Sequence, residues 1–250
     1  MANWNDPQPT RTGFGASPSL NGDALGAAVK FDAGLRRHML SIYNYMASGV
    51  LLSGIVAMLF ANSGMAASVM ATPLRWLIML APLGFVFAMS FGANRMQTGT
   101  LQVLFWSFCV AMGLSLSTIF LVFTGASIAT TFFATAGAFA GLSLVGYTTK
   151  KNLTGMGQFM TMGLIGIVIA MVINIFLQSS GLQLAISILG VLIFAGLTAY
   201  DTQRLKEEYD YVAGSGELAS KASIMGALTL YLNFVNMFQL ILSLTGQRDE

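Results

Sequence analysis

A single carboxylate interrupts the longest uncharged part of the second half of the chain. From Asn152 to Tyr200 there is no Asp, Glu, Lys or Arg, and Asp201 then precedes a cluster of mixed charge that begins at Arg204. A carboxylate inside a bundle of apolar helices can titrate, pair with a cation or hold a metal ion. At the end of a membrane helix it would instead lie among lipid headgroups and pair with Arg204 one turn later. The sequence position leaves both interpretations open.

Three asparagines within apolar stretches are the other candidates for a polar site. Asn233 and Asn236 are three residues apart and so share one face of a helix, while Asn174 lies in a separate apolar run. An amide that faces lipid is costly, so we expect all three side chains to point into the protein. Interhelical hydrogen bonding explains each amide singly. Together with Asp201, they predict a polar interior site.

The elements that position these residues are predicted to be membrane helices. Hydrophobic residues make up 55% of the 250-residue chain and charged residues only 9%, with a mean hydropathy of +0.71, whereas soluble domains carry about a quarter charged residues. The apolar runs are continuous and too long for the alternating strands, about ten residues each, of a membrane barrel. We therefore predict an all-α polytopic membrane protein. Its basic residues form short separate clusters, which argues against nucleic acid as a partner.

Charges and turn residues divide the apolar sequence into segments of membrane length, roughly 20 residues each. The predicted spans are 38–60, 76–93, 101–123, 127–147, 156–178, 182–203 and 222–245. They form a seven-transmembrane-helix bundle over residues 36–250. Residues 1–35 are polar, rich in Gly and Pro and without the apolar stretch of a signal peptide, so we predict a disordered tail. Gly137 and Gly141 have the four-residue spacing that predicts close packing of one helix on another.

The distribution of basic residues predicts the orientation, because Lys and Arg are enriched on the cytoplasmic side. A cytoplasmic N-terminus leaves only Arg75 and Arg248 outside, and with an odd number of spans the C-terminus lies on the opposite side. The residues then placed inside are Lys30, Arg36, Arg37, Arg95, Lys150, Lys151, Arg204, Lys206 and Lys221.

Two motifs resemble the bacterial branch of the Bax inhibitor family. They are Ala199-Tyr200-Asp201-Thr202-Gln203 and the segment from Leu228 to Phe238, LTLYLNFVNMF. The resemblance covers the whole bundle. It implies a seven-helix protein of the inner membrane, in which aspartates on helices six and seven form a pair near the cytoplasmic mouth. It also implies that an arginine from helix two latches this pair and that the assembly is a pH-sensitive calcium leak.

Carried over residue by residue, the resemblance assigns the helix-six aspartate to Asp201 and places Asn233 where the helix-seven aspartate stands. Arg95 is the nearest counterpart of the latch, although a positive-inside anchor explains it equally well. An aspartate beside an asparagine titrates alone rather than as a coupled pair. The predicted gating and ion site therefore comprises Asp201, Asn233, Arg95, Asn236 and Asn174, with a weak, transient calcium site at Asp201 and no cofactor.

Two other functional classes are weighed against the leak. Tyr200-Asp201 is similar to the motif of intramembrane aspartyl proteases, but these need a second aspartate and residues 222–245 contain none. The sequence also lacks a Walker loop and a metal-ligand cluster, so we predict that the protein is not an enzyme. The alternative implied by the resemblance is a non-conducting regulator whose tail binds a membrane-anchored ATP-dependent quality-control protease. Besides that protease, the expected partners are the lipid bilayer and calcium ions.

Overall fold

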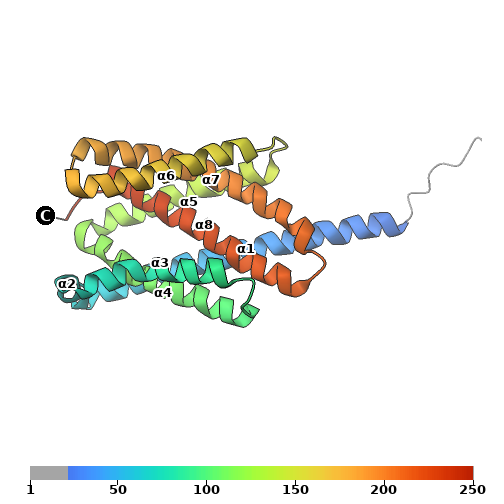
Figure 1. Cartoon of the computed structure of the whole chain (residues 1–250), viewed down its shortest axis with the longest axis horizontal. Coiled ribbons are helices and arrows are strands. Elements are labelled where there is room, and N and C mark those ends of the chain that lie inside the picture. The colour runs from blue at the N-terminus through green and yellow to red at the C-terminus, as the bar shows by residue number, and fades with distance from the viewer. Residues whose placement is uncertain (1–21, 250) are drawn as a thin grey trace, which may run out of the picture.

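The computed structural model describes residues 22–249, and within them the chain forms eight helices (Figure 1). Seven of the eight are long and apolar enough to cross a membrane, which confirms the predicted all-α seven-helix bundle. The short α2 lies in the connection between the first two spans. The helices are α1 (Gly22–Asn62), α2 (Met65–Met70), α3 (Leu74–Gly92), α4 (Thr98–Val122), α5 (Gly125–Thr148), α6 (Thr154–Leu177), α7 (Ser180–Val212) and α8 (Gly216–Thr245).

Two helices extend well beyond the apolar spans that the sequence predicted. Helix α1 already begins at Gly22, within the predicted tail, and α7 continues to Val212 instead of ending near residue 203. Lys, Glu and Arg are good helix formers, so the charged segment after Asp201 continues the helix into the polar phase. Residues 1–21 lie outside the described residues, and the disorder and cytoplasmic placement of the tail stay predictions.

Helix α8 runs through the middle of the bundle and positions most of the core (Figure 1). It packs against α1, α4, α5 and α7, while α6 lies against α7 and α3 lies against α4. A helix that is apolar on all sides belongs in such a central place. Tyr231, Leu230 and Ala227 of α8 are fully buried.

The two described ends of the chain lie at opposite ends of the bundle, as seven crossings require (Figure 1). The α7–α8 turn lies at the same end as the start of α1, and we call this the α7–α8 end. The other end is the C-terminal end. There the backbone N–H of Asp249 donates to Val122 O at 3.0 Å, and that of Thr124 donates to Gln247 O at 3.0 Å. Which end faces the cytoplasm stays a prediction from the basic residues.

Two glycines bring neighbouring helices against the stretch of α7 that carries Asp201. A Cβ on Gly146 of α5 would overlap the backbone carbonyl of Ala199, and a Cβ on Gly157 of α6 would overlap the ring of Tyr200. A Cβ on Gly137 or Gly141 would meet no described atom within 4 Å. The predicted helix packing at this pair is therefore wrong. The two residues lie on the exposed side of α5, opposite its buried face of Ile128, Thr131, Thr135, Phe139, Ser143 and Gly146.

Candidate functional site

Asp201 lies inside the bundle although it stands near the end of the predicted span 182–203. Its exposed fraction is 5%, and α7 continues beyond it to Val212, so the carboxylate is on a continuous helix rather than at a helix end. The side chain faces α8. The interpretation that places Asp201 freely among lipid headgroups is therefore wrong, although the pairing with Arg204 expected there does form.

Each carboxylate oxygen of Asp201 has one donor. Oδ1 lies 3.1 Å from Nη2 of Arg204, one turn further along α7, and Oδ2 accepts a hydrogen bond of 2.7 Å from Nδ2 of Asn233 on α8. Hydrogen bonds to an ionised acceptor are roughly twice as strong as neutral ones. Asp201 thus joins α7 to α8 through a charge-assisted contact.

The ion pair is asymmetric in its exposure to the surroundings. The Asp201 side chain is 8% exposed and that of Arg204 is 47% exposed, and the guanidinium carbon lies 5.8 Å from the centroid of the Tyr200 ring. The arginine is therefore the more accessible partner of the pair. Removing it would leave a buried charge with only an amide partner, which is unfavourable.

A cavity of about 460 Å³ adjoins Asp201 between α6, α7 and α8. Besides Asp201, Arg204 and Asn233, its polar lining includes Thr161, Thr229 and Asn236. Nδ2 of Asn236 donates to Leu232 O of its own helix at 2.8 Å, so this amide does not join two helices. The cavity offers one carboxylate together with amide and hydroxyl oxygens.

The described residues contain no group of three or more His, Cys, Asp or Glu that could hold a metal ion. Calcium takes six to eight oxygen ligands. Asp201 with Asn236, Thr229 and water offers hard oxygen ligands but only one negative charge. Such a donor set fits a transient calcium contact and does not fit a tight structural site.

The whole bundle matches a known family. The family described as "Inhibitor of apoptosis-promoting Bax1" matches residues 35–250. The chain belongs to the Bax inhibitor family. It is a multi-pass membrane protein of that family, as its two motifs predicted.

Bacterial relatives cover nearly the same length. Protein RP147 of Rickettsia prowazekii is 46% identical over 221 residues, covering 88% of this chain and 93% of the relative. A Caulobacter vibrioides protein is 44% identical over 236 residues, with 90% and 94% covered. Inner membrane protein YbhL of Escherichia coli K12 is 43% identical over 221 residues, with 86% and 94% covered.

The latch that the Bax inhibitor resemblance implied is not formed by Arg95 in this structure. Arg95 is exposed in the α3–α4 connection, where its backbone N–H donates to Gly92 O at 2.9 Å. Helix α3 packs against α4, on the side of the bundle away from α7 (Figure 1). The cation that Asp201 meets is Arg204, from its own helix. Arg204 is three residues from Asp201 on α7, so the two side chains meet without either one reaching across the bundle.

Asn174 lies at the C-terminal end of the bundle, and its predicted place in the interior site is wrong. It stands in the last turn of α6, where Oδ1 accepts from the backbone N–H of Ser179 at 3.0 Å. Its Nδ2 donates to Oε1 of Gln183 at 3.2 Å. The amide thus stabilises the α6–α7 turn, where Gln178 has a left-handed φ of 49°.

A chain of hydroxyl groups next to the site was missed by the sequence reasoning. Tyr43 of α1 donates to Ser143 of α5 at 3.0 Å, Ser143 contacts Thr202 of α7 at 3.0 Å, and Thr202 donates to Thr198 O at 2.8 Å. The hydroxyl group of Thr202 donates its one proton to Thr198 O. In the hydrogen bond between Ser143 and Thr202, Ser143 is therefore the donor. Thr198 and Thr202, four residues apart beside Asp201, were the signal in the sequence.

Proposed function

We propose that this protein is a pH-sensitive cation leak of the bacterial inner membrane, with the Asp201 contact as its gate. The observation that carries the proposal is the buried Asp201 carboxylate, which joins α7 to α8 beside a cavity between α6, α7 and α8. The inner-membrane assignment is supported by the relative YbhL, which is named an inner membrane protein. The proposed role is not enzymatic.

The gate rests on the charge of Asp201. An ionised carboxylate holds Arg204 and the Asn233 amide. Protonation removes the negative charge, weakens both contacts and leaves the half-exposed Arg204 free to move outward. Helices α7 and α8 are then held together at this level by apolar packing and a weaker, neutral hydrogen bond. We expect acidification to open the α6–α7–α8 cavity.

The structure corresponds to the closed state of this proposal. Toward the C-terminal end, the space beyond the cavity is filled where Gly190 of α7 approaches Leu240 of α8 and Ile167 of α6: a Cβ on Gly190 would lie 2.6 Å from Leu240 Cδ1. An ion that enters from the α7–α8 end therefore meets apolar side chains. Opening requires α7 and α8 to separate there as well.

Calcium is the proposed cation. With Asp201 protonated and Arg204 displaced, neutral oxygens of Asp201, Asn236, Thr229 and water would line its path. Neutral ligands give weak binding, and conduction requires binding that is weak enough to release the ion. The Asn233 amide in place of a second carboxylate predicts a lower calcium affinity than a carboxylate pair would have.

Calcium flux into proteoliposomes, followed with a trapped indicator across a pH series, tests the proposal. We expect the wild-type flux to rise as the pH falls. Asp201→Asn, which is permanently neutral, should give a high flux that no longer depends on pH, and Asn233→Asp should change the pH range of the response. Arg95→Gln is the matched control and should behave as wild type. Equal flux from all four proteins at every pH would remove Asp201 from the mechanism.

The alternative from another class is a non-conducting regulator of a membrane-anchored ATP-dependent protease. It depends on the N-terminal segment, of which residues 1–21 lie outside the described residues. A variant that lacks residues 2–21 separates the two proposals. Loss of protease binding with calcium flux unchanged would favour the regulator, whereas a pH-dependent flux that requires Asp201 favours the leak.

A further inference from the structure

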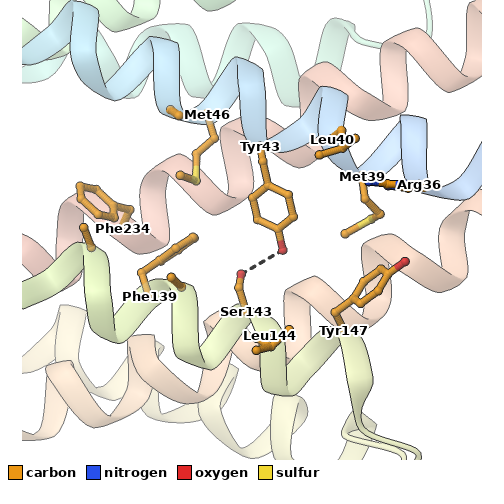
Figure 2. Close-up of a pocket in the computed structure, with 13 residues that line it drawn as sticks. Arg36, Met39, Leu40, Tyr43, Met46, Phe139, Ser143, Leu144, Tyr147 and Phe234 are labelled. Carbon is orange, nitrogen blue, oxygen red and sulfur yellow. Dashed lines mark hydrogen bonds between the residues drawn. The ribbon is translucent and has the colours of Figure 1, made fainter.

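A second cavity of the described bundle is separate from the Asp201 cavity. It has a volume of about 580 Å³ and lies between α1 and α5, with Phe234 of α8 at one end (Figure 2). Small side chains keep the space open, because Ala47 on α1 and Ala136 and Ala140 on α5 line it. We call this the α1–α5 cavity.

The two ends of the α1–α5 cavity differ in chemistry (Figure 2). Arg36 and Tyr147 lie at one end, while Phe139 and Phe234 lie at the other. Between them, the Tyr43 hydroxyl is satisfied by its 3.0 Å hydrogen bond to Ser143. A ligand that fits has a charged or polar head and a hydrocarbon tail.

The polar end carries a basic residue that forms no ion pair among residues 32–249. Within residues 32–249, the ion pairs are those of Arg204 and Lys221, so Arg36 has no carboxylate partner. Lys206 of α7 joins the same end: its Nζ donates to Tyr147 O at 3.0 Å and lies 5.1 Å from the Tyr147 ring centroid. Lys206 also forms no ion pair within that range. One cation thus lines the polar end of an apolar cavity, and a second contacts Tyr147, which lines the same end. This arrangement is the complement of an anionic amphiphile.

We propose that the α1–α5 cavity binds an anionic phospholipid of the surrounding bilayer. The phosphate lies between Arg36 and the Lys206–Tyr147 contact, and one acyl chain enters between α1 and α5 to reach Phe234. A bilayer supplies this ligand laterally, at the depth where Arg36 ends the apolar part of α1. The site does not depend on whether the protein conducts ions.

Lipid retention measured by native mass spectrometry on the full-length protein tests the headgroup contact. The probes are phosphatidylglycerol and phosphatidylcholine with identical acyl chains. We expect the wild type to retain phosphatidylglycerol preferentially. Arg36→Gln should lower that retention about fivefold, the effect of roughly one cation at an anionic membrane surface.

Arg37→Gln is the matched control, because Arg37 is the exposed neighbour of Arg36 but lines a different cavity, beside His38. It should retain phosphatidylglycerol as the wild type does. Equal losses in the two arginine variants would mean general surface attraction and would overturn the proposal. Equal retention of both lipids by the wild type would overturn it as well.

The acyl-chain contact is tested by filling the cavity. Ala140→Trp should lower retention of both lipids, whereas Ala138→Trp, on the exposed side of α5 outside the cavity, should not. Circular dichroism and size-exclusion chromatography check that the variants fold. If Ala140→Trp does not fold, Ala140→Leu gives a smaller loss in the same direction. Unchanged retention in a folded Ala140 variant would place the lipid on the outer surface and overturn the proposal.

Discussion

Replacing Asn233 with leucine is the most direct test of the contact between α7 and α8. The substitution removes the amide that donates to Oδ2 of Asp201 at 2.7 Å, where both residues are 5% exposed. Hydrogen bonds to charged groups contribute about 1.5–3 kcal/mol, and interhelical hydrogen bonds in a membrane protein reach about 1.7 kcal/mol. These ranges meet near 1.5 kcal/mol. We therefore expect Asn233→Leu to lower the free energy of unfolding by about this amount, slightly more than a tenfold change in the folding equilibrium.

Reversible unfolding in mixed micelles, followed by circular dichroism, measures the change in stability. If the bond exists only in the closed state, the same free energy shifts the closed-to-open ratio about tenfold. Calcium flux at neutral pH should then rise by up to about tenfold. Asn236→Leu is the control, because its amide bonds to Leu232 O within α8 and joins no second helix.

We expect Asn236→Leu to change stability by no more than about 0.5 kcal/mol. It is the control for stability alone, because the Asn236 side chain also lines the cavity through which calcium is proposed to pass. Equal effects of the two leucine substitutions on stability would refute the idea that the Asn233 amide holds α7 and α8 together. A lower flux in Asn233→Leu would contradict the assignment of this structure to the closed state.

Three further predictions concern residues around the site. Gly146→Ala should destabilise the protein by about 1–3 kcal/mol in chemical unfolding, because the new methyl group overlaps the α7 backbone. Gly141→Ala is the control: its methyl group meets open space, so the substitution should be neutral or stabilising. Arg204→Gln should increase calcium flux at neutral pH while Arg95→Gln does not, because only the former pairs with the buried carboxylate. Asn174→Ala should cost about 1 kcal/mol of stability through the α6–α7 turn and leave the pH profile of the flux unchanged.

The sequence by itself determined the number and class of the membrane spans. Long uncharged runs without alternation can satisfy their backbone groups in lipid only as helices, so seven spans follow from length and hydropathy. The inward direction of Asn233 also followed, because an amide three residues from a second amide is costly on a lipid-facing side. The number of spans and the inward direction of an amide depend only on the surrounding lipid and on the sequence of each helix taken singly.

Only the tertiary structure decided which residues meet. Asp201 finds Arg204 rather than Arg95 because α3 packs on α4, away from α7. Asn174 stabilises a turn because its position lies in the last turn of α6, and Gly137 faces outward because the rotation of α5 buries Phe139 and Ser143 instead. Neighbour choice and helix rotation arise from packing among all the helices at once. No single segment contains that information, and the α1–α5 cavity, which no motif marks, has the same origin.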